Sequence, residues 1–395
     1  MSFKNPLLLL SMTFVFLLTK VNAQEQSPLL FLSGPTLQQL SETTVHINWV
    51  TSHSTTSWVE YGQTPALGKT ARNSQHGLFD ANLPVEKAIL TELKPGTRYY
   101  YRTVSVEIRE YRAYYVEYGD TLYSDIYSFA TPHNDLNSFS FLAFNDIHDR
   151  PEFIGEVTER EEDFDFVVML GDIMGHIDHE KDIVSNILAP ASQYFATEKP
   201  MYYIRGNHEA RGPQARKLID YIEAPEGNFY YSFRYGPVFF IVLDTGEDKP
   251  DTNQYYYGLA DFDRYREQQG VWLEEVINSK EYNDAKFRIL LIHWPVLLRE
   301  VVAGDEIHRH GRRNAQKHFA DLLHNNGVDL QLCGHTHRYE IIKPEEGVSN
   351  IYTVVGGGHT GQPNSTYTRV DFNGNELKVS LKHTCGELIE EFVIR

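Results

Sequence analysis

Five short segments of this sequence place histidine beside aspartate or asparagine, the residue types that bind first-row transition metals. Mixed imidazole and carboxylate ligands favour zinc, manganese or iron over calcium. A single His-x-His pair would be weak evidence in a chain with 17 histidines, so the prediction of a metal site depends on the recurrence. The segments are Asn145-Asp146-Ile147-His148, Gly171-Asp172, Gly206-Asn207-His208-Glu209, His293-Trp294-Pro295 and Gly334-His335-Thr336-His337.

The number of candidate ligands suits two metal ions rather than one. Two divalent ions about 3.5–4 Å apart commonly share a bridging carboxylate and a bridging hydroxide. Such a pair lowers the pKa of a bound water, so that hydroxide is available near neutral pH. The candidate ligands are Asp146, His148, Asp172, Asn207, His293, His335 and His337.

Each of the five segments directly follows a short apolar run that reads as a strand. From residue 139 onward such strands alternate with helical stretches, which is typical of an α/β domain. Ligands in open α/β sheets bind at the carboxyl ends of strands, so we expect the five segments to meet. The predicted strands are Phe139–Phe144, Phe166–Leu170, Met201–Ile204, Val238–Leu243, Ile289–Ile292, Leu330–Cys333 and Ile351–Val355, and one helix is predicted over Arg313–Asn326.

Residues 28–132 have a different pattern, with short alternating strands and regular turns. Val45–Val50 alternates apolar and polar residues, as a half-buried strand does. We predict an all-β sandwich over residues 28–132, a polar linker over 132–138, and the α/β domain over 138–395.

The five segments, in this order and context, resemble the calcineurin-like metallophosphoesterases. The order of Trp49, Leu93-Lys-Pro-Gly-Thr-Arg-Tyr99 and Ser128-Phe-Ala-Thr-Pro132 resembles a fibronectin type III domain. That domain, together with the extended His337-Arg-Tyr-Glu340, resembles the purple acid phosphatases. The resemblance implies a mixed β-sandwich flanked by helices in an α/β/β/α order, preceded by the fibronectin-like sandwich.

The resemblance also implies a role for each candidate residue. Asp172 would bridge the two ions. His208 would face the substrate and either stabilise the transition state or protonate the leaving oxygen. The first ion would be held by Asp146, His148 and His337, and the second by Asn207, His293 and His335. A break after Gly334 would then splay His335 and His337 to opposite sides of the centre.

One position departs from the purple acid phosphatase pattern. That family carries an iron-binding tyrosine three residues after the bridging aspartate, where this chain has Gly175, and it generally lacks a histidine at the position of His148. We hypothesise a colourless enzyme with two divalent ions.

These features predict an exported phosphoesterase, most simply a phosphomonoesterase, in which a metal-bridged hydroxide attacks a small phosphorylated substrate. A phosphodiesterase or nucleotide hydrolase with the same site is the alternative, and a non-catalytic extracellular binding protein would require a broken ligand set. Several other residues have weaker assignments. His308–Arg313 could bind a second phosphate or a leaving group, or be a solvated basic loop ahead of a helix, and His176, His179 and His359 could rim the site.

Bulk properties limit the partners and the compartment. The formal net charge of −18 over 395 residues disfavours a nucleic-acid partner, which would need a basic face. Residues 1–23 read as a secretory signal peptide cleaved after Ala23, which predicts a periplasmic or extracellular protein with no membrane span. Cys333 and Cys385 could pair in such a compartment or stay free. The oligomeric state and the physiological substrate stay open.

Overall fold

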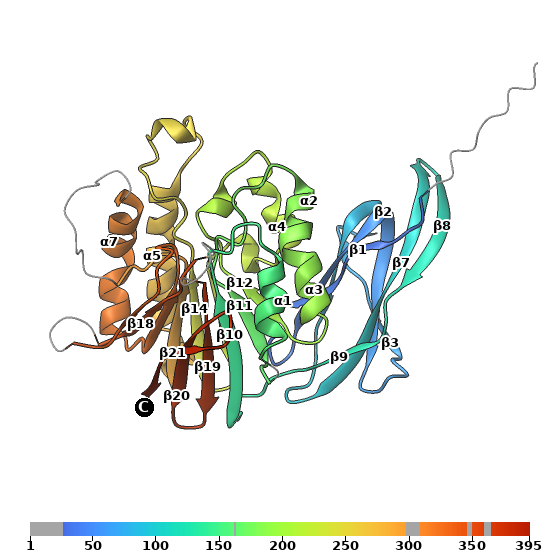
Figure 1. The fold of residues 1–395 in the computed structure, drawn as a ribbon. Coiled ribbons are helices and arrows are strands. Elements are labelled where there is room, and N and C mark those ends of the chain that lie inside the picture. The colour runs from blue at the N-terminus through green and yellow to red at the C-terminus, as the bar shows by residue number, and fades with distance from the viewer. Residues whose placement is uncertain (1–26, 162, 298–308, 346–349, 359–364) are drawn as a thin grey trace, which may run out of the picture.

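The computed structural model describes residues 27–161, 163–297, 309–345, 350–358 and 365–395 (Figure 1). The predicted signal peptide, His308 and His359 lie outside these residues.

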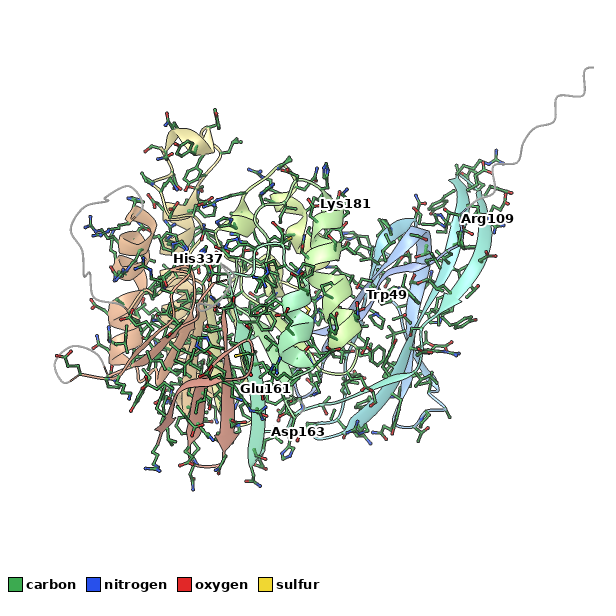
Figure 2. All side chains as sticks on the ribbon, in the orientation of Figure 1. Trp49, Arg109, Glu161, Asp163, Lys181 and His337 are labelled. Carbon is green, nitrogen blue, oxygen red and sulfur yellow. The ribbon has the colours of Figure 1, made fainter. Side chains whose placement is uncertain are left out.

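The described residues before 138 form strands and turns, and their aromatic side chains build a core between the strands. Trp49 is fully buried (Figure 2), and its indole N–H donates a 2.9 Å hydrogen bond to Ser105 Oγ. Tyr99 and Phe129 stack with ring centroids 5.8 Å apart. The strands are β1 Phe31–Gln38, β2 Val45–Gly62, β3 Lys69–Ala71, β4 Ser74–Gln75, β5 Leu78–Phe79, β6 Leu83–Leu90, β7 Arg98–Arg112, β8 Tyr115–Tyr123 and β9 Tyr127–Ala130.

The strands of the described residues from 138 onward form two mixed sheets, and the facing sides of these sheets share one apolar core. Phe141 from the first sheet meets Phe240 from the second edge-on, with ring centroids 5.6 Å apart. The first sheet has the order β21-β20-β19-β10-β11-β12, with β10 Ser138–Phe144, β11 Phe166–Met169, β12 Met201–Tyr203, β19 Thr366–Asn373, β20 Leu377–His383 and β21 Leu388–Ile394. The second has the order β13-β14-β15-β16-β18-β17, with β13 Tyr231–Tyr235, β14 Val238–Leu243, β15 Phe287–Ile292, β16 Leu330–Cys333, β17 Glu340–Ile342 and β18 Tyr352–Val355.

Helices cover the outer face of each sheet, which gives the α/β/β/α order expected from the resemblance (Figure 1). On the first sheet the core includes Ile154 of α1 and Ala191 of α3. On the second it includes Leu273 of α5 and Phe319 of α7. The helices are α1 Glu152–Thr158, α2 Glu180–Ile183, a π-helical turn Val184–Leu188, α3 Ala189–Tyr194, α4 Leu218–Tyr221, α5 Phe262–Ile277, α6 Lys280–Asn283 and α7 His310–Asn325. Short 3₁₀ turns lie at His208–Ala210, Ala215–Lys217, Pro225–Gly227 and Gln254–Tyr256.

The N-terminal strands contact the first sheet directly, in addition to the covalent connection before β10. β1 pairs in parallel with β12 through Gln38 and Met201. Beside this junction, the Glu223 carboxylate forms an ion pair with Lys87 Nζ at 2.8 Å and lies 2.7 Å from His46 Nδ1. These contacts hold the N-terminal part against the larger part in one orientation.

All seven predicted strands of the α/β part are confirmed to within two residues. The predicted helix exists, but it begins at His310 rather than Arg313, so the solvated loop, one alternative for His308–Arg313, is wrong for residues 310–313. Two contacts account for the earlier start: the Gly311 N–H donates to Asp248 O at 2.8 Å, and His310 Nε2 lies 2.8 Å from the Asp263 carboxylate. Cys333 is buried and Cys385 exposed, and the two are not bonded to each other.

Candidate metal centre

The carboxyl ends of five strands, drawn from both sheets, bring the predicted ligands into one place. β10, β11 and β12 of the first sheet lead into residues 145–148, 171–172 and 206–208. β15 and β16 of the second sheet lead into residues 293 and 334–337. The candidate site therefore lies at the shared edge of two sheets, and neither sheet alone supplies it.

The first group of possible ligands contains Asp146, His148, Asp172 and His337, each offering an atom within 4.8 Å of the others. His337 Nε2 lies 3.2 Å from Asp146 Oδ1 and 3.1 Å from His148 Nε2. His148 Nε2 is 3.9 Å from Asp172 Oδ2. Two imidazoles and two carboxylates facing one point are a donor set for a transition-metal ion.

The second group contains Asp172, His293 and His335, and it shares Asp172 with the first. His293 Nε2 lies 3.1 Å from Asp172 Oδ2. His335 and His337, although only two residues apart, fall into different groups. Their φ angles of 72° and 56° lie in the left-handed region, so the chain does not continue as a strand, and the two side chains need not point the same way.

Asn207 lies beside the second group, but its carbonyl oxygen already receives two hydrogen bonds. Trp294 Nε1–H donates to Asn207 Oδ1 at 3.1 Å, and because an indole nitrogen can only donate, this atom is the amide oxygen. His335 Nδ1 lies 3.0 Å from the same oxygen and must carry the proton of that contact. The arrangement leaves His335 Nε2 as the free nitrogen; direct ligation by Asn207 stays a prediction.

Two buried atoms at the centre lack the partner that a folded protein normally supplies. Within the described residues, Asp146 Oδ1 and His293 Nε2 are buried without a properly aligned hydrogen bond. His293 Nδ1 lies 2.7 Å from Leu170 O, so Nδ1 carries the proton and the lone pair of Nε2 faces Asp172. His293 Nε2 and Asp172 Oδ2 are then two buried acceptors that face each other, which costs free energy unless a proton or a cation lies between them. The residues present therefore fit a metal pair.

The pKa shifts of the buried residues also favour a cation at the centre. Burial would lower the pKa of His293, but Asp172 and Asp146 outweigh it and raise the pKa to about 10. Burial and the charge of His293 lower the pKa of His335 to about 4. Burial would raise the pKa of Asp172, but His293 outweighs it and lowers the pKa. Without metal, a proton on His293 would offset the carboxylates; a cation would take its place.

The backbone is strained where the ligands lie. Asp146, His148 and Asp172 have φ angles of 53°, 42° and 52°, a region that side chains other than glycine rarely adopt. Such strain persists only where surrounding contacts over-determine it, and it clusters at functional sites. Gly206 lies so close to Asp172 that any side chain there would collide with the carboxylate. The close approach of the Asp172 carboxylate therefore accounts for a glycine at position 206.

Glu209 is the main contributor that sequence reasoning missed. The side chain is fully buried and accepts four backbone N–H hydrogen bonds. Oε1 accepts from Ile173 and Met174 at 2.7 and 3.1 Å, and Oε2 accepts from Asp172 and Gly206 at 3.0 and 2.9 Å. Glu209 thus ties the loop of Asp172 to the loop of Asn207. The only sequence clue was that an acidic residue directly follows His208.

His208 lies at the edge of the centre, with both ring nitrogens engaged. Its backbone N–H donates to Asp172 Oδ1 at 2.9 Å, and its Nδ1–H donates to Gly175 O at 2.7 Å. Arg211 Nη1 donates to His208 Nε2 at 2.8 Å, while the rest of that guanidinium forms a bidentate pair with Glu247 at 2.6 and 2.9 Å. Burial, helped by the Arg211 charge, lowers the pKa of His208 against the pull of Asp172. His208 is therefore neutral here.

Other residues named from sequence belong to neither ligand group. His176 is exposed and lies 3.2 Å from Asp178, and His179 begins α2, where its backbone N–H donates to Asp182. His310 is paired with Asp263. In the part of the chain that the structure describes, no helix is long and apolar enough to cross a lipid bilayer.

Comparisons with known families match two separate stretches of the chain. A model described as calcineurin-like phosphoesterase matches residues 139–339, and one described as purple acid phosphatase, N-terminal domain, matches residues 35–131. The chain is 24% identical over 139 residues to the Pongo abelii serine/threonine-protein phosphatase CPPED1, covering 35% of this chain and 42% of that protein. It is 24% identical over 317 residues to the human acid phosphatase type 7, covering 75% and 67%. The chain thus spans less than half the length of the CPPED1 relative.

Solved structures share the fold. Purple acid phosphatase PPD1 from yellow lupin seeds matches with a TM-score of 0.66 at 16% identity, over 92% of this chain and 74% of that one. A structure of PhoD matches with a TM-score of 0.62 at 13% identity, over 92% and 88%. At these identities the matches show the fold alone, including the β-rich N-terminal part.

Proposed function

This chain belongs to the calcineurin-like phosphoesterase family, and on that premise we propose that it is an exported phosphomonoesterase that uses two divalent metal ions. The observation that carries the proposal is the pair of ligand groups that share Asp172. Both groups contain a buried atom, Asp146 Oδ1 or His293 Nε2, that lacks an aligned partner within the described residues. Two adjacent ions with a common carboxylate would satisfy both atoms.

The proposed assignment of ligands follows the two groups. Asp146, His148 and His337 would hold the first ion, and His293 and His335 the second, with Asn207 as a further ligand. Asp172 would bridge. When bound, the ions would supply positive charge for the phosphate oxygens and a hydroxide nucleophile near neutral pH. Zinc, manganese and iron all suit this donor set.

The residues of the chain would orient the ligands and the substrate. Leu170 O fixes the proton of His293 on Nδ1, which keeps Nε2 free for metal. Asn207 does the same for His335. Glu209 holds the backbone of Asp172 in its strained conformation. Arg211 is the cation nearest to His208, so it would bind a phosphate oxygen, or steady the leaving oxygen, when substrate enters.

His208 has two proposed roles, and both depend on the proton of Nε2. A general acid must carry a proton on the nitrogen that faces the leaving oxygen. His208 Nε2 instead accepts a hydrogen bond from Arg211, so proton donation would require substrate to displace that contact. Donation from Nε2 to a phosphate oxygen in the transition state would also need a proton on that nitrogen, and the leaving-group experiment in the Discussion separates the two roles.

The proposal of a colourless centre depends on Gly175. A side chain there would begin 2.8 Å from Asp149 Oδ2, and the Gly175 backbone is engaged by Asp149 and His208. A side chain at position 175 would therefore displace the Asp149 carboxylate, and His148 belongs to the first ligand group. A visible tyrosinate-to-iron absorption band in the purified holoprotein would refute this part of the proposal.

One experiment tests the function. Protein stripped with chelator is reloaded with zinc, manganese or iron, and its metal content is measured beside hydrolysis of phenyl phosphate and diphenyl phosphate. We expect about two ions per chain and a higher kcat/KM for phenyl phosphate. Preference for diphenyl phosphate would identify a phosphodiesterase instead. Two bound ions with neither substrate hydrolysed would contradict the proposal.

Export and domain division complete the proposal. The composition of residues 1–23 supports removal after Ala23, followed by a fibronectin-like domain over 28–132 and the phosphoesterase domain over 138–395. The mass of the protein recovered from a secreting host tests this directly. A mature chain that retained Met1 would contradict cleavage.

A further inference from the structure

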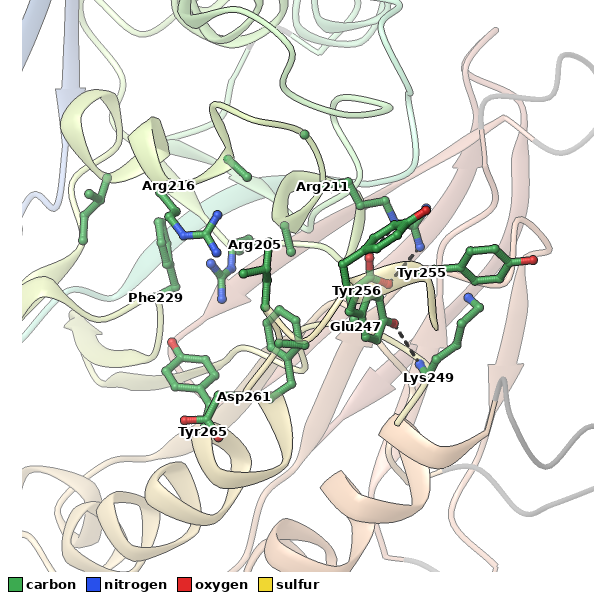
Figure 3. A pocket seen from close by; sticks show the side chains of 18 of the residues that line it. Arg205, Arg211, Arg216, Phe229, Glu247, Lys249, Tyr255, Tyr256, Asp261 and Tyr265 are labelled. Atoms are coloured by element: carbon green, nitrogen blue, oxygen red, sulfur yellow. Dashed lines mark hydrogen bonds and ion pairs between the residues drawn. The ribbon is translucent and has the colours of Figure 1, made fainter. Parts of the chain in front are cut away.

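A large cavity opens beside the candidate metal centre and is not used by the ligands. Its volume is about 930 Å³, at the upper end of the range for small-molecule sites. It lies between the segment 205–219 and the segment 247–268 (Figure 3). We call it the aromatic pocket, because its lining includes Phe229, Tyr255, Tyr256, Tyr257, Phe262 and Tyr265.

Arg211 connects the aromatic pocket to the centre. Its side chain lines the pocket, and its Nη1 donates to His208 Nε2, whose ring nitrogen is 3.9 Å from the shared carboxylate of Asp172. A phosphate held at the centre would therefore project its ester substituent past His208 and Arg211 into the pocket.

The pocket lining has more positively than negatively charged side chains, although the protein is strongly acidic. Four of its lining residues carry positive charge and two carry negative charge, whereas the whole chain has a formal net charge of −18. Three of the cations are already neutralised by a nearby carboxylate. Arg205 pairs with Asp244 at 2.7 Å, Arg211 with Glu247 at 2.6 Å and Lys249 with Asp248 at 2.7 Å.

Arg216 is the exception. Within the described residues it has no ion pair or hydrogen bond to its side chain, and it lies on the side of the pocket that holds Phe229 and Tyr265 in the view of Figure 3. The other acid of the lining, Asp261, is largely exposed and lies 3.9 Å from Arg264. The pocket therefore has aromatic walls and one cation whose charge is not offset.

The walls suit a flat ring. The Arg205 guanidinium lies 4.5 Å from the ring centroid of Phe229 and 5.8 Å from that of Tyr265, so planar groups already stack there. The hydroxyl of Tyr256 accepts from the Lys249 N–H at 3.2 Å, which holds that ring in place. A planar substituent could pack against these aromatic side chains with little further loss of side-chain conformational entropy.

We propose that the aromatic pocket is the leaving-group subsite of the phosphoesterase, and that it selects phosphate esters of an aromatic alcohol that bears an anionic group, with Arg216 binding that anion. This inference rests on the proposed function. Arg216 is a specificity-determining residue in this scheme, and it has no part in the chemical step.

The test compares two esters of equal shape. The substrates are 6-carboxynaphthalen-2-yl phosphate and its uncharged amide, 6-carbamoylnaphthalen-2-yl phosphate, and the readout is the ratio of their kcat/KM values. Arg216→Gln should lower this ratio up to about fivefold, the range for a partly exposed ion pair, and should leave phenyl phosphate hydrolysis unchanged. Lys217→Gln is the matched control, because Lys217 is the adjacent cation, pairs with Asp220 at 3.0 Å and does not line the pocket.

A second readout does not require turnover. Binding of 2-naphthoate to metal-free protein, measured by calorimetry, should weaken in Arg216→Gln and not in Lys217→Gln. Naphthoate binding that depends on Arg216, in a protein that hydrolyses no phosphate ester with any metal, would support the pocket and refute the proposed function. Normal hydrolysis with a carboxylate-to-amide ratio that Arg216→Gln does not change, or that Lys217→Gln changes equally, would overturn the inference.

Discussion

Replacing Glu209 with glutamine should loosen the loop that carries Asp172 while keeping the size of the side chain. Each carboxylate oxygen of Glu209 accepts two backbone N–H groups, at distances between 2.7 and 3.1 Å. In Glu209→Gln one of these oxygens becomes an NH₂ group, whichever way the amide turns. Two backbone N–H groups then face a donor.

The size of the effect follows from burial. Glu209 is 0% exposed, so water cannot replace the lost acceptor. A buried polar group left without its partner costs about 1–3 kcal/mol, and two such groups give a loss of about 2–6 kcal/mol in the free energy of unfolding. Because outer partners of metal ligands typically contribute about 10–100-fold in metal affinity, we expect metal binding to weaken by a similar factor.

The assay is urea unfolding of metal-free protein, together with competition of the holoprotein against a chelator. Glu274→Gln is the control, since Glu274 is an exposed residue of α5. It should change neither quantity. Glu209→Gln protein that is as stable as the wild type and binds metal equally well would refute the view that Glu209 holds the Asp172 loop in place.

Three further predictions test the site and the fold. Asp172→Asn keeps an acceptor for the His208 N–H but removes the shared charge, so phenyl phosphate turnover should fall at least about 100-fold. The circular dichroism spectrum should be unchanged. Near-normal turnover with both metals bound would exclude bridging by Asp172. His208→Ala should slow alkyl phosphate hydrolysis by roughly 10²–10⁴-fold and 4-nitrophenyl phosphate far less if His208 is an acid, whereas an equal loss on both esters indicates transition-state stabilisation. For Glu223, burial would raise the pKa, but His46 and Lys87 outweigh burial and lower the pKa to about 2 from 4.5. The resulting contribution of Glu223 to the free energy of unfolding, about 3 kcal/mol, is present above pH 4.5 and lost as the pH falls toward 2. Glu223→Gln should remove that part of the pH dependence in acid unfolding curves.

The elements that lead into the site could be predicted from sequence because their signals are local. Val238–Leu243 is a continuous apolar run and Leu330–Cys333 is interrupted only by Gln331, which is typical of strands buried on both faces, and their predicted bounds equal the observed ones. The ligand residues follow directly after such strands. The C-terminal strands β19 to β21 were missed because polar residues interrupt them. Arg369 and Lys382, for example, are paired with Glu161 at 2.9 and 2.5 Å, more than 200 residues away in the chain.

Sequence by itself determined the fold class, the family resemblance and the set of residues that could bind metal, because strand periodicity and the residue types at strand ends are readable along the chain. Tertiary structure decided everything that depends on distances between segments. It placed His335 and His337 in different ligand groups, and it made Glu209 a four-fold acceptor. It paired three pocket cations with carboxylates and left Arg216 without a partner among the described residues. Hydrogen bonds and ion pairs act over a few ångströms in space, whatever the separation in sequence, so only the folded chain shows which groups are satisfied and which remain free for a ligand.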